Sequence, residues 1–435
     1  MEQDVNTDMK QPVLALEGTS RLLFEALHEG SRDPASGGVT RDAYGAGEQF
    51  AHALMAEHAR KIGLEVRQDD ACNLYMVWPG RDRALPAVVI GSHLDSVPAG
   101  GNFDGAAGVV SGLVAVQALK DAGYRPECDI VVMGVRAEES AWFHVSYTGS
   151  RAALGRFKAT ELQARRFDTG KTLADHIRAC GGDPDAIAAG KAVFTPDNVR
   201  AFMEVHIEQA PSMAQARVPV AIGTGIPGNV RYPQVTIRGE YAHVGLPRRF
   251  RHDAALAGAD FATAMDRLWA EWDAAGRGMA YTIGEFYTDA GNHGMTKVAG
   301  EFRFSLDVRA YEERDVAELE AFVLRTVGAI EAQRGVRFDL GRRTTAEVAK
   351  ADPVIFAQLE QIAGSLEIAT IRLPSPASHD AAAFCAAGIP FGLVFIRNPN
   401  GSHHPDEAMD IRDFSLATAV LAQWLKQQVC GEAAR

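Results

Sequence analysis

The sequence of 435 residues is poor in cysteine and contains no long apolar run. Its five cysteines are scattered and form no C-x-x-C pair, which is typical of a reducing compartment rather than of a disulfide framework. No apolar run approaches the roughly 20 residues that a membrane-spanning helix needs. The polar N-terminal segment also lacks the apolar stretch of a signal peptide. We therefore expect a cytoplasmic protein with no membrane segment.

Basic residues are also scarce, because 44 lysines and arginines stand against 56 aspartates and glutamates, for a net charge of -12. Nucleic acids and anionic membranes are bound by basic patches, so we expect neither as a partner. The sequence has no Walker A loop, no H-E-x-x-H and no G-x-S-x-G motif. A G-x-G-x-x-G match at 223–228 contains Pro227 and precedes a strand-like segment, which argues against a nicotinamide-dependent oxidoreductase.

What is present is typical of a soluble globular protein, with 47% hydrophobic and 23% charged residues and a length that favours two domains. Segments 84–95, 108–123 and 128–140 have the patterns of a strand, a helix and a second strand. Because the first and last of these contain short continuous apolar runs, they predict buried strands of a mainly parallel sheet. The expected fold class is therefore α/β.

A second pattern interrupts this one in the second half of the chain. Six segments predict the order β-α-β-β-α-β, which is ferredoxin-like: 229–240, 252–276, 279–288, 301–310, 311–335 and 336–345. The α/β pattern then resumes. We predict a larger α/β domain made of residues 1–212 and 346–435, with a small α+β domain, residues 213–345, inserted in it.

Polar residues with metal-binding side chains follow the predicted strands of the larger domain at four places. They are His93 with Asp104, Glu138 with Glu139, His206, and the pair His403 and His404. Loops that follow parallel strands meet at one edge of a sheet, where active sites of α/β proteins form. Histidine and carboxylate ligands suit zinc or a related transition metal, and one carboxylate can bridge two ions.

Each of these residues also has a structural explanation when it is taken alone. His93 is most simply a hydrogen-bonded polar group, and Asp104 could cap the helix that follows it. The paired glutamates could be solvated loop acids, and His206 a satisfied core histidine. The metal-site hypothesis is favoured because all four places fall where one site would form.

Seven motifs in order resemble those of the M20 metallo-amidohydrolases: HLDSVPAGGNFDG, RAEES, EVHIEQAP, GEYAHVG, LDVR, SHDAAAF and GSHHPDE. The similarity is greatest to the branch of N-carbamoyl-L-amino acid hydrolases, β-ureidopropionases and allantoate amidohydrolases. It implies a dinuclear-metal hydrolase that cleaves the linear C–N bond of an N-carbamoyl amino acid and releases the amino acid, CO2 and ammonia. It also implies that the inserted domain is a lid and a dimerisation domain, so that the protein is a homodimer.

The resemblance assigns the metal ligands residue by residue. One ion would be held by His93, Asp104 and His206, and the second by Asp104, Glu139 and His403. His403 is preferred to His404 because the family ligand directly follows the serine. The ions could be zinc, manganese, cobalt or nickel. Asp95 would orient His93 from behind, and Glu138 would be the general base.

The resemblance also implies residues that bind a small carboxylate-bearing substrate. His243 would stabilise the oxyanion, and Arg309 would clamp the carboxylate, either in the same subunit or across the dimer. Gln209 and His379 would contact the substrate, and Asn292 would replace the asparagine that the family has where this chain has Thr296. His243 could instead be a surface histidine, Arg309 a solvated strand end and His379 an ordinary residue at the start of a helix.

The sequence departs from the family near the expected substrate site. Arg248, Arg249 and Arg251 follow His243 where the family has Thr-Pro-Met, and SPASHDA replaces a glycine-rich SGAGHDA. The substrate side chain, the α- or β-amino position and the stereochemistry therefore stay open. The alternative activity is that of an N-acyl amino acid deacylase or dipeptidase. A non-catalytic binding protein is disfavoured because the ligand set and the base are complete.

Overall fold

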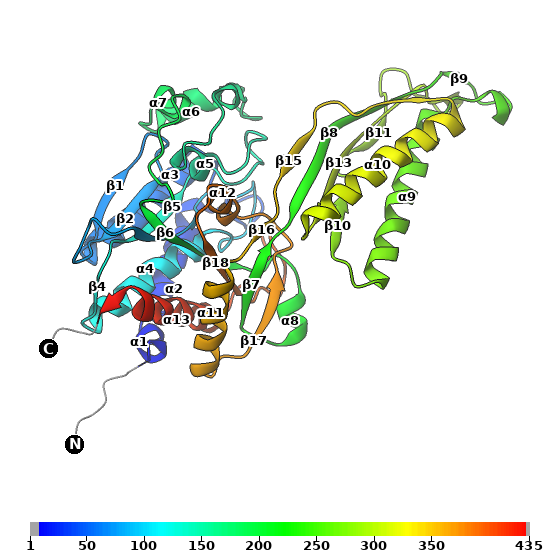
Figure 1. Cartoon of the computed structure of the whole chain (residues 1–435). Coiled ribbons are helices and arrows are strands. Elements are labelled where there is room, and N and C mark those ends of the chain that lie inside the picture. The colour runs from blue at the N-terminus through cyan, green and yellow to red at the C-terminus, as the bar shows by residue number, and fades with distance from the viewer. Residues whose placement is uncertain (1–7, 432–435) are drawn as a thin grey trace. The chain divides into compact units, whose positions relative to one another are not determined.

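The computed structural model describes residues 8–431 and divides the chain into two compact units (Figure 1). Of the described residues, the first unit comprises 8–225 and 350–431, and the second comprises 226–349. The predicted boundaries were 213 and 345. The first differs because β7 (Val220–Ile226) pairs with β18 (Phe391–Ile396) in the large sheet of the first unit. The second differs because residues 344–346 still pair with residues 229–231 of the second unit. No helix in residues 8–431 combines the length and the apolar character needed to cross a membrane.

Among the described residues, the first unit is built on a nine-stranded sheet. In spatial order its strands are β1 (Glu65–Gln68), β2 (Leu74–Trp78), β5 (Ile130–Val135), β3 (Ala87–His93), β6 (Val199–Ile207), β18, β7 and β16 (Ala349–Lys350), with β17 (Thr370–Pro374) beside β7. The four central strands β5, β3, β6 and β18 are parallel, and antiparallel strands flank them. The predicted α/β class with a mainly parallel sheet is confirmed.

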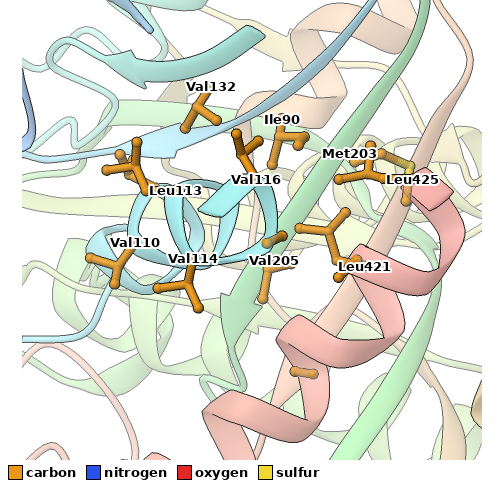
Figure 2. Close-up of a cluster of buried hydrophobic side chains, with 14 of the residues drawn as sticks. Ile90, Val110, Leu113, Val114, Val116, Val132, Met203, Val205, Leu421 and Leu425 are labelled. Carbon is orange, nitrogen blue, oxygen red and sulfur yellow. The ribbon is translucent and has the colours of Figure 1, made fainter. Parts of the chain in front are cut away.

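Helix α4 (Ala106–Asp121) packs against this sheet and is buried on nearly all sides, with 13 of its 16 residues inaccessible to solvent. Its side chains Leu113 and Val116 lie with Ile90 and Val132 of the sheet and with Leu421 of α13 (Ile411–Gln428), as Figure 2 shows. A helix that is apolar all round is a core helix. Each buried leucine contributes about 2 kcal/mol, so the N-terminal end of α4 is held firmly in place.

The remaining elements of the first unit surround the sheet. The helices are α1 (Lys10–Leu14), α2 (Glu17–Ser31), α3 (Ala46–Lys61), α5 (Thr148–Ala153), η1 (Ala159–Gln163), α6 (Leu173–Ala179), α7 (Pro184–Ala188), α8 (Ser212–Ala216), α11 (Pro353–Ser365) and α12 (Asp380–Ala386), and β4 (Arg125–Pro126) pairs with β19 (Cys430–Gly431). Two of the helices begin with Asp-Pro: Asp183 caps α7 and Asp352 caps α11 through their carboxylates. This sequence suits a helix start, because the aspartate accepts a free backbone N–H and the proline needs none.

The second unit is an antiparallel sheet covered by two helices. Its elements are β8 (Gly228–Arg238), β9 (Ala242–His243), η2 (Arg248–Phe250), α9 (Ala254–Ala274), β10 (Met279–Thr282), β11 (Phe286–Thr288), β12 (Lys297–Val298), β13 (Glu301–Ala310), α10 (Glu313–Arg334), β14 (Arg337–Asp339) and β15 (Thr344–Ala346). The main strands lie in the order β10-β13-β8-β14, and β9 pairs with β12 apart from them. Alternate residues of β13, among them Phe304 and Val308, are buried and share a core with Phe261 and Val323 of the two helices. The main elements follow the predicted order β-α-β-β-α-β.

Candidate metal centre

The four central strands of the large sheet bring the predicted metal-binding residues together. His93 is the last residue of β3, and Asp104 lies two residues before α4. Glu138 and Glu139 follow β5, His206 is near the end of β6, and His403 follows β18. Because these strands are parallel and adjacent, their carboxyl ends meet at one edge. All of these residues belong to the first unit.

The first ligand group consists of His93, Asp104 and His206. Their ligand atoms lie within 4.8 Å of one another. Asp104 Oδ1 is 3.1 Å from His206 Nε2 and 3.5 Å from His93 Nε2, and all three side chains are at most 4% exposed. Within residues 8–431, this buried oxygen accepts no hydrogen bond. A buried carboxylate oxygen that faces two imidazole nitrogens without a donor is what a cation site requires.

The second ligand group consists of Asp104, Glu139 and His403, which also lie within 4.8 Å of one another. His403 Nε2 is 3.3 Å from Asp104 Oδ2 and 3.2 Å from Glu139 Oε1. Asp104 therefore turns one oxygen to each group, so its carboxylate could bridge an ion in each if both groups held one. His403 is 48% exposed, so this side of the centre is open to solvent. The donor set of imidazoles and carboxylates fits zinc, manganese, cobalt or nickel.

The ring orientations of His93 and His206 are set by their second nitrogens. His93 Nδ1 lies 3.1 Å from the carbonyl oxygen of Asp95, and His206 Nδ1 lies 2.9 Å from that of Ile207. A nitrogen that faces a carbonyl donates, so Nε2, which faces Asp104, is the nitrogen of each ring that would offer a lone pair to a cation. Burial by itself would lower the pKa of His93, but Asp104, Asp95 and Glu138 raise this pKa well above its usual value.

Asp95 was predicted to orient His93, and it also forms hydrogen bonds with two other residues of the centre. Its Oδ1 is 3.4 Å from His93 Nδ1, farther than its own carbonyl oxygen. Its carboxylate accepts the backbone N–H of Glu138 at 3.0 Å and that of Glu139 at 3.1 Å. Asp95 therefore orients His93 mainly through its backbone, and it places the base candidate and a ligand through its side chain.

Glu138 is buried and lies beside the first ligand group, with Oε2 3.9 Å from His93 Nε2. Burial raises the pKa of its carboxyl well above the usual value, and His93 opposes this effect. The preceding residue, Ala137, has a positive φ of 48°. Its N–H donates to the buried carboxylate of Glu48, which also binds Arg136. These contacts of Glu48 hold the turn that directs the Glu138 side chain toward the ligand group.

The loop after β18 separates the two adjacent histidines. His404 Nε2 lies 2.9 Å from the carbonyl oxygen of Asn400, and its Nδ1 accepts the N–H of Asp406. These contacts turn His404 into its own loop, whereas His403 faces Asp104. The geometry therefore agrees with the choice of His403 as the ligand.

We predict that His403→Ala lowers the metal content by one ion per subunit, because it removes the imidazole of the second group. His404→Ala is the matched control, and it should keep the wild-type metal content because its ring faces Asn400. Metal analysis of the two purified variants after dialysis against trace metal checks this. Equal metal loss in both variants, or loss in His404→Ala alone, would contradict the assignment.

Two further predicted residues lie at the centre. Gln209 Nε2 donates to Asp104 Oδ2 at 2.9 Å, and its buried Oε1 has no hydrogen-bond partner among the described residues. The His379 ring lies 4.4 Å from that of His206, and its Nε2 is 2.6 Å from the Ser375 hydroxyl. Burial and the nearby His206 hold the pKa of His379 well below its usual value. His379 is therefore a neutral ring beside a ligand.

Glu204, His206 and His379 form another group with ligand atoms within 4.8 Å. The atoms of this group that could bind a metal already make hydrogen bonds. The Glu204 carboxylate accepts from the Ser92 hydroxyl and from the N–H of Ala381. His379 Nε2 likewise meets the Ser375 hydroxyl. This group is thus satisfied by hydrogen bonds and does not need an ion.

The other three predicted residues lie in the second unit. His243 is an exposed residue of β9, and its Nδ1 accepts the N–H of Gly245. Asn292 donates to Asp289 within its loop, and Arg309 makes a two-pronged ion pair with Asp307 on the same strand. Their parts in substrate binding stay predictions.

Several residues that support the centre were not predicted from the sequence. The buried carboxylates of Glu407 and Glu48 and the hydroxyl of Ser402 hold the ligand-bearing loops, and buried Arg41 donates to Asn102 beside Asp104. Ser402 and Glu407 stand in the motif GSHHPDE, so the sequence could have pointed to them. It could not have identified the partners of the supporting residues, because most of these contacts join segments far apart in the chain.

An α/β sheet with histidines and carboxylates gathered at its strand ends is typical of a metal-dependent hydrolase. The chain belongs to peptidase family M20/M25/M40, which it matches over residues 89–427. It is 32% identical over 414 residues to the N-carbamoyl-L-amino acid amidohydrolase of Geobacillus stearothermophilus, covering 93% of this chain and 97% of that protein. It is 31% identical to the enzyme of that name from Paenarthrobacter aurescens, with 92% and 96% covered.

Solved structures agree with this relationship. A hydantoinase/carbamoylase family amidase from Burkholderia ambifaria superposes with a TM-score of 0.80 at 27% identity and covers 96% of this chain and 98% of that one. The predicted resemblance to the M20 metallo-amidohydrolases is confirmed. The relatives are named amidohydrolases, so the predicted enzyme class, an amidohydrolase that acts on C–N bonds other than peptide bonds, is confirmed as well.

Proposed function

We propose that this protein is a dinuclear-metal hydrolase of N-carbamoyl (ureido) amino acids. The observation that carries the proposal is Asp104, whose two carboxylate oxygens face two separate groups of imidazole and carboxylate ligands. Relatives named N-carbamoyl-L-amino acid amidohydrolase, allantoate amidohydrolase and ureidoglycolate hydrolase support a substrate with a ureido group.

The proposed ligands are three residues for each ion. His93, Asp104 and His206 would hold one ion, and Asp104, Glu139 and His403 the other. Bound ions of this kind act as Lewis acids and lower the pKa of water. We propose zinc, manganese, cobalt or nickel, because the donors are imidazoles and carboxylates.

Glu138 is the proposed general base. Its carboxylate accepts a proton from the attacking water and returns it to the nitrogen of the amino acid when the C–N bond breaks. The water oxygen becomes part of carbamic acid, which decomposes to CO2 and ammonia. Asp95 and Glu48 keep Glu138 in place by binding the backbone on either side of it.

The residues of the second unit complete the proposal. We propose that this unit is a lid and a dimerisation domain of a cytoplasmic homodimer. His243 would stabilise the oxyanion, and Arg309 would bind the substrate carboxylate. Asn292 would contribute an amide, and Gln209 and His379 would contact the substrate from the first unit. Lid closure would exclude water from the reaction.

A substrate panel tests this function. We expect the protein loaded with manganese or zinc to hydrolyse N-carbamoyl amino acids and release one ammonia for each amino acid. N-acetyl amino acids are the matched comparison, because a methyl group replaces the terminal amino group of the ureido unit. Turnover is measured by amino acid and ammonia release.

The same panel contains the outcomes that would refute the proposal. Hydrolysis of the acetyl compounds or of dipeptides, without hydrolysis of the carbamoyl compounds, would favour a deacylase or dipeptidase. Including N-carbamoyl-β-alanine, allantoate and ureidoglycolate distinguishes α-, β- and ureido-acid substrates. No turnover of any carboxylate-bearing member would remove the support for Arg309 as the anchor.

A further inference from the structure

Glu407 connects the two loops that carry ligands of the second group. Its Oε1 accepts the backbone N–H of Phe103 at 2.7 Å and that of Asp104 at 3.1 Å. Its Oε2 lies 2.6 Å from the hydroxyl of Ser402, the residue before His403. The residue is 7% exposed. A single buried carboxylate therefore ties the segment with Asp104 to the segment with His403, which is far away in the sequence.

The hydroxyl of Ser402 lies between two carboxylates. Its oxygen is 2.5 Å from Asp104 Oδ2 and 2.6 Å from Glu407 Oε2. A hydroxyl has one hydrogen, so it donates to one of the two at a time. When it donates to Glu407, Asp104 Oδ2 accepts one fewer hydrogen bond and, beside the bond from Gln209, has a lone pair for a cation shared with His403. Glu407 thus offers the hydroxyl an alternative acceptor.

The backbone around His403 needs such support. His403 has a positive φ of 67°, a conformation that residues other than glycine rarely adopt. Two side-chain amides brace the loop, because Asn398 donates to the carbonyl of Gly401 and Asn400 donates to that of Asp406. A strained backbone conformation persists where contacts from several sides hold the residue in it. The bonds from the N–H groups of Phe103 and Asp104 to Glu407 join this loop to the Asp104 loop, and the Ser402–Glu407 contact fixes the residue next to His403 to the same carboxylate.

The other side of the Asp104 loop is held as well. Arg41 is fully buried, donates to the carbonyl of Leu94, and donates to the side chain and backbone carbonyl of Asn102. Gly101 has no side chain where a Cβ would overlap the carboxylate of Glu407. The loop is thus shaped to accept the Glu407 carboxylate at close range.

We propose that Glu407 is a positioning residue of the metal centre, which holds Asp104 and His403 at the spacing that the second ion requires. This inference rests on the dinuclear centre proposed above. The proposal predicts a larger effect on the second ion than on the first, because the first ligand group does not contain His403. Loss of the Glu407 ties should therefore weaken the second ion more than the first.

The test uses the full chain and metal binding rather than turnover. Purified wild type, Glu407→Gln, Ser402→Ala and the control Glu25→Gln are freed of metal with a chelator and titrated with manganese in a calorimeter. Glu25 is an exposed residue of α2 that lines the same cavity as Glu407, so its substitution controls for charge loss at that surface. Thermal unfolding of each metal-free protein is measured in parallel.

We expect Glu407→Gln to bind the first ion like the wild type and the second at least about tenfold more weakly, as for other residues that orient metal ligands. Ser402→Ala should shift the second ion in the same direction, and Glu25→Gln should leave both unchanged. A lower melting temperature with both affinities at the wild-type value would mean a purely structural role and overturn the proposal.

Two other results are also decisive. If Glu407→Gln does not fold, Ser402→Ala decides, since it leaves the bonds from Glu407 to the backbone of Phe103 and Asp104 in place. Wild-type affinity for both ions in Ser402→Ala would then overturn the proposal. If the wild type binds fewer than two ions, the dinuclear centre itself is refuted. If the wild type and both variants bind two ions equally well, the dinuclear centre stands and only the role of Glu407 is refuted.

Discussion

Glu138→Gln should bind metal like the wild type and lose most of its turnover, with kcat lower by about 10²- to 10⁴-fold. The amide keeps the size of the side chain but cannot accept a proton. The backbone N–H of Glu138 still donates to Asp95, so the loop should keep its position. Steady-state kinetics with an N-carbamoyl amino acid and metal analysis of the same sample check the prediction.

The neighbouring carboxylate provides the matched control. Glu139→Gln makes the same chemical change one residue later, and Glu139 lies 3.2 Å from His403 in the second ligand group. We expect this variant to lose an ion, whereas Glu138→Gln keeps both. Near-normal kcat in Glu138→Gln would rule out the base assignment, and loss of an ion there would make Glu138 a ligand instead.

Asp104→Asn should have the other large effect, because Asp104 is shared by both ligand groups. An asparagine keeps one oxygen, but its amide nitrogen cannot bind a cation, so at most one site survives. We expect no more than one ion per subunit and a fall in kcat/KM of at least about a thousandfold. The rate estimate follows from losing a metal that stabilises charge in the transition state.

The fold of this variant should stay intact, because α4 is held by its buried apolar side chains rather than by Asp104. Circular dichroism of the variant should match that of the wild type. Asp121→Asn, at the exposed far end of the same helix, is the control and should keep both ions and full activity. Two tightly bound ions in Asp104→Asn would show that this carboxylate is not the bridge.

Much of the centre could be predicted from the sequence. His93 and the paired glutamates follow apolar strands, and Asp104 precedes an apolar helix, so local patterns alone place them at strand ends. The parallel arrangement of β5, β3, β6 and β18 then brings these ends to one edge. The family motifs supplied the order of the ligands, which composition and periodicity do not contain.

The second unit shows the limit of local patterns. Its element order was predicted, but its first boundary lies at residue 226 rather than 213, because β7 pairs with strands of the first unit. Whether an apolar strand joins one sheet or the next depends on partners elsewhere in the chain. Periodicity describes which face of a strand is apolar and does not describe which strand lies beside it.

The sequence by itself determined the α/β class, the strand-end residues and the family, because these follow from local patterns and from the order of motifs. The tertiary structure decided which oxygen of Asp104 faces which group, which of two adjacent histidines faces the centre, and what Asp95 and Glu407 bind. These choices are made by hydrogen bonds between distant segments. Their energies depend on distance and direction, and both are set only when the chain is folded.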